Sequence, residues 1–307
     1  MLRRVSGYNL DCYVPGAQPD GFNLSQMIVG SEGTLAIILA AKVRLTPRPA
    51  HAAIVTLEFA SLDDALDAVL PCLEVKPSAV ELMDDILLGL ARRSHSHSHY
   101  LDLFLQGQPA AMLQVEFFAD STEALEERIA ALDAHIRHSC RATAITPARS
   151  PAQRNAILQV RKAGMPLLQS ISPDRKPETF VEDAAVPPER LGSYIRAFRD
   201  ICRAHNLDVA FYGHASVGVM HPRPLLNLKN PEDVKTMRAV AQEVRDLVIE
   251  HGGALSGEHG DGILRSEFNR DLFGDRLMAA FAEIKRSFDP HAAVSYTHLT
   301  LPTNREV

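Results

Sequence analysis

Histidines and carboxylates gather in two glycine-rich segments of the C-terminal half. The first segment, 212–221, reads YGHASVGVMH and places His214 and His221 seven positions apart across a turn of small residues. The second segment, 252–262, reads GGALSGEHGDG and holds Glu258 and His259 among glycines, which let a backbone approach a ligand closely. Two imidazoles and one carboxylate suit a divalent metal that keeps open positions for a substrate. His259 would then remain free for proton transfer.

A structural role is the alternative for each of these residues taken singly. His214 and His221 could be satisfied histidines at the ends of strands, and Glu258 could cap a turn. Their combination with the glycines favours the metal site. The tract HSHSH at 95–99 also has metal-binding residues, but it lies in a serine-rich connection, so we expect a solvated loop there.

A third segment with chemical potential lies near the start of the chain. Residues 27–35 read MIVGSEGTL, in which apolar residues precede a loop of small residues and an apolar run follows it. Such a loop offers free backbone N–H groups that can hold a phosphate or border a flat ring. Taken alone, it is often only a tight turn.

Apolar runs alternate with amphipathic helical stretches between these segments, which is typical of an α+β protein. The predicted strands are 35–45, 54–59, 80–83, 111–118, 179–186 and 208–214. The predicted helices begin at Ser61 and span 121–138, 187–205 and 231–251. Prolines at 47 and 49 indicate a domain boundary near residues 46–51. The same order of strands and helices occurs twice, which predicts two ferredoxin-like units that could share a sheet.

Composition bounds the class of protein. The chain has 307 residues, of which 46% are hydrophobic, and a formal net charge of -6, which argues against a nucleic-acid-binding surface. It contains no apolar run of about 18 residues, roughly what a membrane-spanning helix needs, and no signal peptide is recognisable. We expect a cytoplasmic protein. The four cysteines form no C-x-x-C pair, so no zinc ribbon or iron–sulfur cluster is predicted within these residues.

The three motifs GSEGTL, G-H-x6-H and SGEHG occur here in the order found in FAD-linked oxidases of the vanillyl-alcohol oxidase type. The sequence resembles the C-terminal domain of that family, in the group of D-lactate, glycolate and D-2-hydroxyglutarate dehydrogenases. The segments FVEDAAVPPERL, YGHASVGVMH and SGEHGDG are most similar to long bacterial members that carry an iron–sulfur region after the oxidase domain. The resemblance covers residues 1–294 and implies FAD as cofactor, with an iron–sulfur cluster further downstream.

The resemblance also implies roles for individual residues. The implied metal ligands, usually for zinc, are His214, His221 and Glu258, and the implied catalytic base is His259. Arg161 would bind the substrate carboxylate as a bidentate fork, with Lys176 assisting. A solvated helix arginine is an equally good interpretation of Arg161. The implied flavin contacts are Tyr8, Gly30, Ser31, Glu32, Gly33 and Thr34.

Departures from the family pattern set further expectations. Val217 and Val219 stand where many relatives have Asp and Asn, so the residues that orient the metal ligands must differ. We expect 1–48 to be the end of a flavin-binding α+β domain and 49–294 to be a ferredoxin-like, antiparallel-sheet substrate domain with helices. The tail 295–307 resembles translated adapter sequence. No flavin pyrophosphate loop precedes GSEGTL, so we interpret the chain as a fragment.

The expected function is oxidation of a small D-2-hydroxy acid to the 2-oxo acid by metal-assisted proton abstraction and hydride transfer to FAD. Electrons would pass on to an iron–sulfur protein or a quinone, which allows a position at the periphery of the inner membrane. Two alternatives stay open. A metal-dependent hydrolase would use the same cluster to activate water, and a non-catalytic zinc-binding module would use it only to fold.

Overall fold

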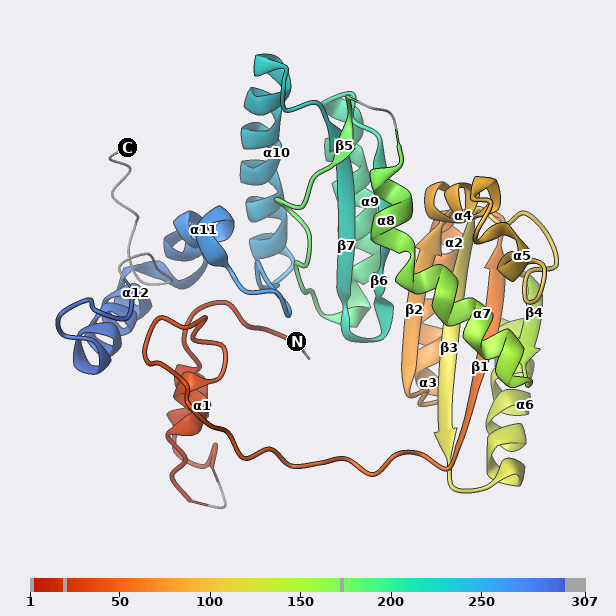
Figure 1. The fold of residues 1–307 in the computed structure, drawn as a ribbon, viewed down its shortest axis with the longest axis horizontal. Coiled ribbons are helices and arrows are strands. Elements are labelled where there is room, and N and C mark those ends of the chain that lie inside the picture. Colours follow the sequence, from red (N-terminus) through yellow and green to blue (C-terminus); the bar gives the residue numbers. More distant parts are fainter. Residues whose placement is uncertain (1–2, 19–20, 172–173, 296–307) are drawn as a thin grey trace.

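A computed structural model describes residues 3–18, 21–171 and 174–295. Within these residues one antiparallel sheet of seven strands runs in the order β4-β1-β3-β2-β6-β7-β5 (Figure 1). The strands are β1 (His51–Phe59), β2 (Ala79–Asp84), β3 (Ala111–Ala119), β4 (Ala142–Ala148), β5 (Lys176–Pro177), β6 (Val209–His214) and β7 (Val219–Leu226). The predicted α+β class with an antiparallel sheet is confirmed. Residues 296–307 of the predicted non-native tail lie outside the described residues.

The first unit runs from β1 to β4 and has ferredoxin-like order, β4-β1-β3-β2. Its helices are α2 (Leu62–Asp67), α3 (Val69–Glu74) and α6 (Thr122–Ser139), together with α4 (Asp85–Arg93) and α5 (Ser98–Leu101) between β2 and β3. Ser61 and Ser121 begin α2 and α6 as N-caps, because each hydroxyl accepts a backbone N–H from the first turn. The strands and helices predicted for this half are confirmed.

The second unit adds β6, β7 and two long helices to the same sheet. Its helices are α9 (Leu191–Ala204) and α10 (Pro231–Glu250), which agree with the predicted helices at 187–205 and 231–251. β6 pairs antiparallel with β2 through Leu82 opposite Gly213 and Met83 opposite Tyr212. The prediction that both units share a sheet is therefore confirmed.

The predicted strand 179–186 is wrong as a continuous strand. The segment follows β7, since Glu178 N–H donates to Pro224, Asp183 N–H to Met220 and Val186 N–H to Gly218. The pairing slips along the way because Asp183 adopts φ 69, outside the strand region. Only Ala185 forms bridges, to Val219 and Ala254. The interruption leaves the carboxylates at 182 and 183 free for contacts outside the ladder.

The predicted strand 35–45 is also wrong. These residues cross as coil from α1 (Ser25–Ile28) to β1, with no strand assigned among the described residues (Figure 1). Leu35 is buried, whereas Leu39 is 92% exposed and Leu45 84% exposed. An apolar pattern alone forms no strand, because a strand needs a neighbour to pair its backbone N–H and C=O groups.

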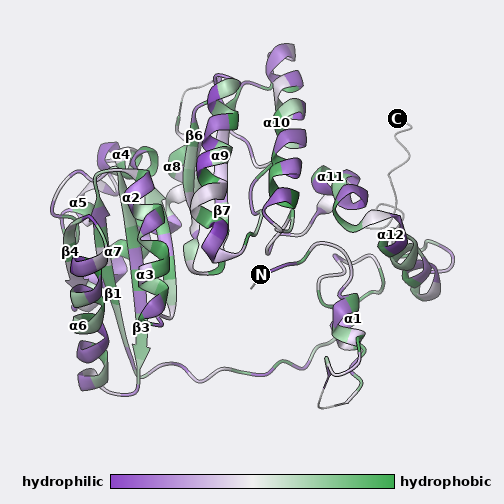
Figure 2. Ribbon diagram, turned by 180° about the vertical axis from the view of Figure 1, so that it is seen from behind, coloured by the Kyte–Doolittle hydropathy of each residue, from purple (hydrophilic) through white to green (hydrophobic). Residues whose placement is uncertain are grey.

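Helices cover both faces of the sheet. α2, α3, α6, α9 and α10 pack on one face around Leu57, Leu113 and Phe198. α4, α5, α7 (Pro151–Lys162) and α8 (Gly164–Gln169) pack on the other face around Met83 and Met112. The strands are mostly hydrophobic, and the helices carry hydrophilic residues on their outer sides (Figure 2). None of the described helices has the length and hydropathy of a membrane span.

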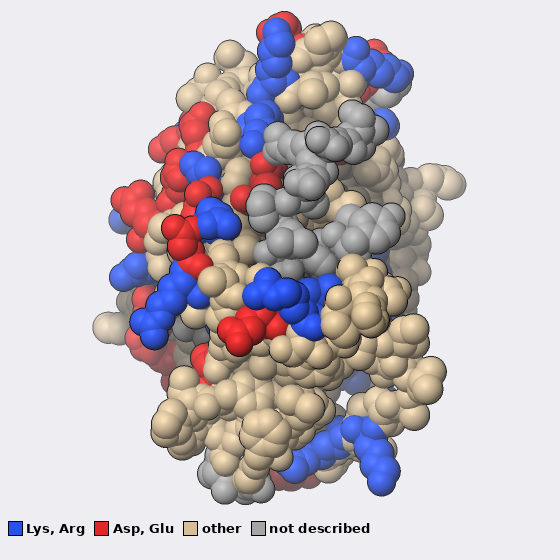
Figure 3. All heavy atoms as spheres, turned by 90° about the vertical axis from the view of Figure 1, so that its left-hand side faces the viewer, with Lys and Arg blue, Asp and Glu red and all other residues tan. Residues whose placement is uncertain are grey.

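A separate lobe joins the two ends of the described chain. α11 (Gly262–Arg265) and α12 (Asn269–Phe288) lie beside residues 3–18 and 21–35, and Tyr8, Met27 and Phe281 share its small core. Buried Lys285 donates to the Thr34 carbonyl at 2.6 Å, which ties α12 to the GSEGTL loop. On the face shown in Figure 3, Lys and Arg side chains lie among Asp and Glu side chains. The division between 1–48 and 49–294 stays a prediction.

Candidate functional site

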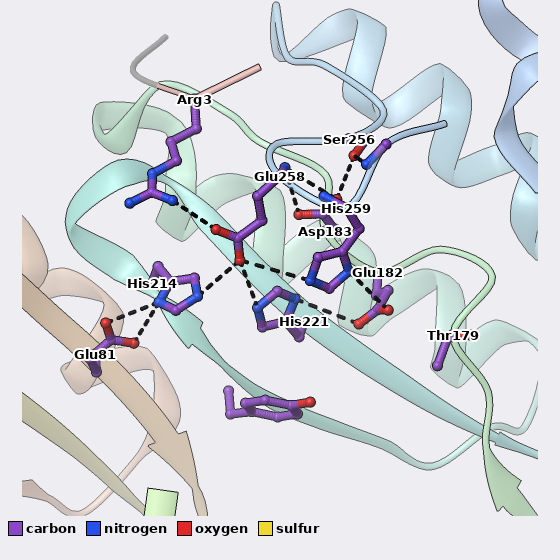
Figure 4. A network of polar contacts seen from close by, with 12 residues as sticks. Arg3, Glu81, Thr179, Glu182, Asp183, His214, His221, Ser256, Glu258 and His259 are labelled. Carbon is purple, nitrogen blue, oxygen red and sulfur yellow. Dashed lines mark hydrogen bonds and ion pairs between the residues drawn. The ribbon is translucent and has the colours of Figure 1, made fainter. Parts of the chain in front are cut away.

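Three histidines and several carboxylates meet beside β6 and β7 (Figure 4). His214 is the last residue of β6, His221 lies on β7, and Glu258 and His259 lie on the loop after α10. Glu258 Oε1 is 3.0 Å from His214 Nε2 and 3.6 Å from His221 Nε2. One possible ligand atom of each of these three residues lies within 4.8 Å of the others. The structure thus brings the predicted metal ligands together in a geometry that fits one ion.

Glu81 on β2 orients His214. Its carboxylate oxygens lie 2.9 and 3.0 Å from His214 Nδ1, and this hydrogen bond raises the pKa of His214 above its ordinary value. Arg161 NH2 lies 3.1 Å from the same nitrogen, but a guanidinium can only donate, so Nδ1 either accepts from Arg161 or donates to Glu81. We assign the Nδ1 proton to the hydrogen bond with the Glu81 carboxylate. In this neutral tautomer Nε2, which faces Glu258, carries the lone pair. A carboxylate behind an imidazole is the usual support of a metal-bound histidine.

His221 is buried and held neutral. Burial, with the charges of His214 and His259 next, lowers the pKa of His221 to about 3. Its Nδ1 has no hydrogen-bond partner among the described residues, and the nearest carboxylate, of Glu182, is 3.6 Å away. A neutral imidazole aimed at the Glu258 carboxylate has the chemistry of a metal ligand. The residues present therefore fit a divalent ion.

His259 stands beside the predicted ligands on the more exposed side. Its ring stacks on His221 with centroids 5.2 Å apart and an interplanar angle of 4°. Its Nδ1 lies 3.3 Å from Glu182 Oε1, and its side chain is 44% exposed. A histidine that is oriented by a carboxylate and open to solvent has the arrangement of a general base.

Each carboxylate of the cluster also contacts an arginine. The pairs are Arg161 with Glu81 at 2.9 Å, Arg3 with Glu258 at 2.8 Å, and Arg223 with Glu182. Each of these three carboxylates thus lies between a guanidinium and an imidazole.

The two predicted substrate residues are placed differently. Arg161 lies near the end of α7, is one-third exposed and reaches the cluster through Glu81 and His214. Lys176 Nζ donates to the carbonyls of Gln169 and Ile171 at 2.8 and 3.0 Å. Among the described contacts, Lys176 touches no residue of the cluster. The structure gives Arg161 a position at the site and gives Lys176 a position at the end of α8.

Five of the predicted flavin residues form one loop, 30–34, and the sixth, Tyr8, contacts it. Tyr8 Oη and Thr34 Oγ1 are 2.7 Å apart, and Thr34 Oγ1 donates to the Ser31 carbonyl. Gly30 and Gly33 have φ of 79° and 70°, a conformation that favours glycine. Glu32 instead contacts the backbone of the 256–262 loop at Asp261 and Gly262. The loop predicted for the flavin therefore touches the loop that carries Glu258 and His259.

Several residues of the site were not predicted from the sequence. They are Arg3, Glu81, Glu182, Asp183 and Arg223. A weak signal exists for two of them, since Glu81 interrupts the apolar strand VELM and Arg223 is two positions after His221, hence on the same strand face. In the HSHSH tract, residues 95–97 form a turn as predicted, whereas residues 98–99 begin α5.

The fold and the cluster define an α+β protein whose shared sheet carries an imidazole–carboxylate site. A family model described as FAD linked oxidases, C-terminal domain, matches residues 48–295, so the chain belongs to this family. The chain is 33% identical over 297 residues to D-2-hydroxyglutarate dehydrogenase of Escherichia coli (strain K12), covering 94% of this chain and 29% of that protein. It therefore spans less than a third of the length of that relative.

Two further proteins extend the comparison. D-lactate dehydrogenase of Archaeoglobus fulgidus is 27% identical over 271 residues, which cover 88% of this chain and 55% of that protein. The structure of 4-ethylphenol oxidase from Gulosibacter chungangensis superposes with a TM-score of 0.62 at 13% identity, covering 83% of this chain and 55% of that chain. The latter likeness shows the fold alone.

Proposed function

We propose that the chain forms the substrate and metal part of a flavin-dependent dehydrogenase that oxidises a D-2-hydroxy acid to the 2-oxo acid. The observation that carries the proposal is the convergence of His214, His221 and Glu258 within 4.8 Å, with His259 beside them. Family membership and the names of the relatives, D-2-hydroxyglutarate and D-lactate dehydrogenases, support the substrate class.

Two bound groups are part of the proposal. A divalent ion, zinc in the first instance, would supply Lewis acidity at His214, His221 and Glu258, and FAD near Tyr8 and residues 30–34 would accept the hydride. The fit of the ion is supported by the neutral, buried His221 and by the carboxylate behind His214.

The chain's own residues would bind and deprotonate the substrate. Arg161, which is partly exposed and uses one terminal nitrogen for Glu81 and His214, retains N–H groups for the substrate carboxylate. His259 would take the proton of the hydroxyl group on Nε2. Glu182, 3.3 Å from Nδ1, would fix the ring orientation and stabilise the imidazolium that results. Lys176 stays a predicted helper whose amine is engaged elsewhere.

Elemental analysis tests the metal site first. We expect one divalent metal per chain in the purified protein and none after the double change His214→Ala and His221→Ala. His205→Ala is the matched control, because His205 pairs with Glu243 on the surface. Absence of metal from both proteins under metal-supplemented purification would refute the site.

Flavin reduction tests the reaction. In a polypeptide that also contains a flavin-binding half, D-2-hydroxy acids should bleach the flavin absorbance under anaerobic conditions. His259→Asn should abolish bleaching and keep the metal, whereas full bleaching by this variant would remove His259 as the base. Metal retention without bleaching by any 2-hydroxy acid would favour the hydrolase or the zinc module instead. The electron acceptor, the downstream iron–sulfur cluster and the cytoplasmic location stay predictions.

A further inference from the structure

Six consecutive backbone N–H groups of the loop that carries Glu258 and His259 are hydrogen-bonded. Gly257 N–H donates to the Asp183 carbonyl, and Glu258 and His259 N–H donate to the Asp183 carboxylate at 3.1 and 2.8 Å. Gly260 N–H donates to the Ser256 hydroxyl at 2.7 Å. The last two N–H groups, of Asp261 and Gly262, donate to Glu32 at 2.7 and 3.0 Å. The N–H groups of this loop are therefore already used by acceptors of the chain itself.

Two carboxylates from distant segments provide most of these acceptors. Asp183 lies in the interrupted segment beside β7, and Glu32 lies in the GSEGTL loop. Both residues have positive φ, 69° and 52°, which costs a non-glycine residue conformational energy. The rest of the structure holds both backbones in this conformation. The two carboxylates bind different parts of the loop, and Figure 4 shows the contacts of Asp183.

Two glycines of the 256–262 loop leave no room for a side chain. A Cβ on Gly260 would lie 2.6 Å from Glu32 Oε1, and a Cβ on Gly257 would lie 2.8 Å from a Val219 methyl group. Arg265, which is buried, donates to the Gly260 carbonyl at 2.8 Å and to the Glu182 carbonyl at 3.0 Å. The loop is thus tied through its backbone to Glu32 on one side and to the segment 182–183 on the other.

We infer that Glu32 is a positioning residue: its carboxylate fixes the 256–262 loop, and through it the orientation of Glu258 and His259. The inference gives Glu32 a role different from the flavin contact predicted from the sequence, since both of its oxygens accept from the loop. It rests on the proposed function only where metal binding is the readout.

The test compares Glu32→Gln with a matched surface change, Glu126→Gln, which removes one partner of the exposed Arg149 pair. Glu32 is itself exposed, so its substitution leaves the hydrophobic core intact. In Glu32→Gln the amide NH2 faces a backbone N–H and cannot accept from it. Gly260→Ala breaks the same contact from the other side.

Cobalt(II) titration and hydrogen exchange are the two readouts. We expect Glu32→Gln and Gly260→Ala to weaken cobalt binding about ten-fold, as loss of residues behind metal ligands typically does, and to change the d–d absorption bands. We also expect faster amide exchange in peptides covering 256–262, with circular dichroism unchanged and Glu126→Gln like the parent. Affinity and exchange within about two-fold of the parent in Glu32→Gln would overturn the inference. If the parent itself binds no cobalt, the proposed metal site fails, and the exchange data alone decide the role of Glu32.

Discussion

Charge pairing dominates the site at the scale of single residues. Arg223 and Glu182 are both buried, and Arg223 also donates to the Tyr212 hydroxyl at 2.8 Å. A buried charge without its partner is costly, because the protein interior solvates ions poorly. The Glu182 carboxylate in turn faces His221 and His259. This pair is therefore a structural support of the histidines as well as a source of charge.

Removal of one member of this pair should be strongly destabilising. We expect Arg223→Met to lower the free energy of unfolding by about 3 kcal/mol, because the buried Glu182 carboxylate loses its counter-ion. The double variant with Glu182→Gln should recover part of this loss. Urea denaturation measures both, with Arg149→Met as an exposed-pair control that should change by less than about 1 kcal/mol. A change of that small size in Arg223→Met would contradict the argument.

Acid sensitivity should come in part from Asp289. Its hydrogen bond with Lys285 lowers its pKa from 3.8 to about 2. The folded state thus prefers the carboxylate, so Asp289 stabilises the protein above pH 3.8, and this contribution is lost as the pH falls toward 2. Urea denaturation should therefore show a stability difference between the parent and Asp289→Asn at pH 6 that narrows below pH 4. If the stability difference between the parent and Asp289→Asn does not vary with pH, the ionised carboxylate is not the source of the stabilisation.

At the scale of elements, the turn between β6 and β7 sets the spacing of His214 and His221. Gly218 closes this turn with φ 72, and its carbonyl accepts from Val186 N–H at 2.9 Å. A Cβ at this position would lie 1.8 Å from the Val186 carbonyl oxygen, which is backbone and cannot rotate away. The turn can form only with glycine here.

Gly218→Ala should therefore cost more than a positive φ alone. We expect at least about 2 kcal/mol of lost stability, against about 1 kcal/mol for Gly16→Ala. Gly16 is the matched control because its φ is 85 and no atom lies within 4 Å of a Cβ placed there. Thermal unfolding of both variants measures the difference. Equal losses would mean that the turn can shift to make room.

The sequence predicted elements with a regular local pattern. β1, β3 and α6 were recognised from alternation or helical spacing. β7 was missed because it contains Pro222 and Pro224, which are unfavourable inside a ladder. The segments 35–45 and 179–186 were mistaken for strands, since a missing neighbour and a positive φ at Asp183 leave no local signal.

The site was predictable to a similar extent. The motif residues His214, His221, Glu258 and His259 meet as expected. His214 ends a predicted strand and Glu258 follows a predicted helix, whereas His221 lies on β7, which was not predicted. Glu81 comes from a strand more than one hundred positions away, and no local pattern links it to His214. The predicted assistance of Lys176 stays a prediction, since its amine donates to the carbonyls of Gln169 and Ile171.

On the scale of the whole molecule, the site lies where three parts meet. Glu81 and Arg161 come from the first part of the sheet and the helices on it, His214 and His221 from the second, and Glu258 from the loop that leads into the lobe. The first and second parts share only the β2–β6 pairing within the sheet. A bound ion would therefore join β6 and β7 to the loop that leads into the lobe.

Metal should stabilise the folded chain accordingly. An ion at one hundred times its Kd should add about 2.7 kcal/mol to the free energy of unfolding, because it binds the folded state only. Thermal unfolding with zinc and with a chelator measures this gain. The His214→Ala, His221→Ala variant should show no gain, and an equal gain there would place the ion elsewhere.

The contacts of Glu32 have a thermodynamic consequence. Its backbone belongs to the 30–34 loop, while its carboxylate holds the amides of Asp261 and Gly262. Any ligand of the 30–34 loop that shifts Glu32 must then change the affinity for a ligand of Glu258. Reciprocity requires the second ligand to change the affinity for the first by the same factor. A ligand that strengthens the contacts of Glu32 would then promote binding at Glu258, and a ligand that weakens them would oppose it.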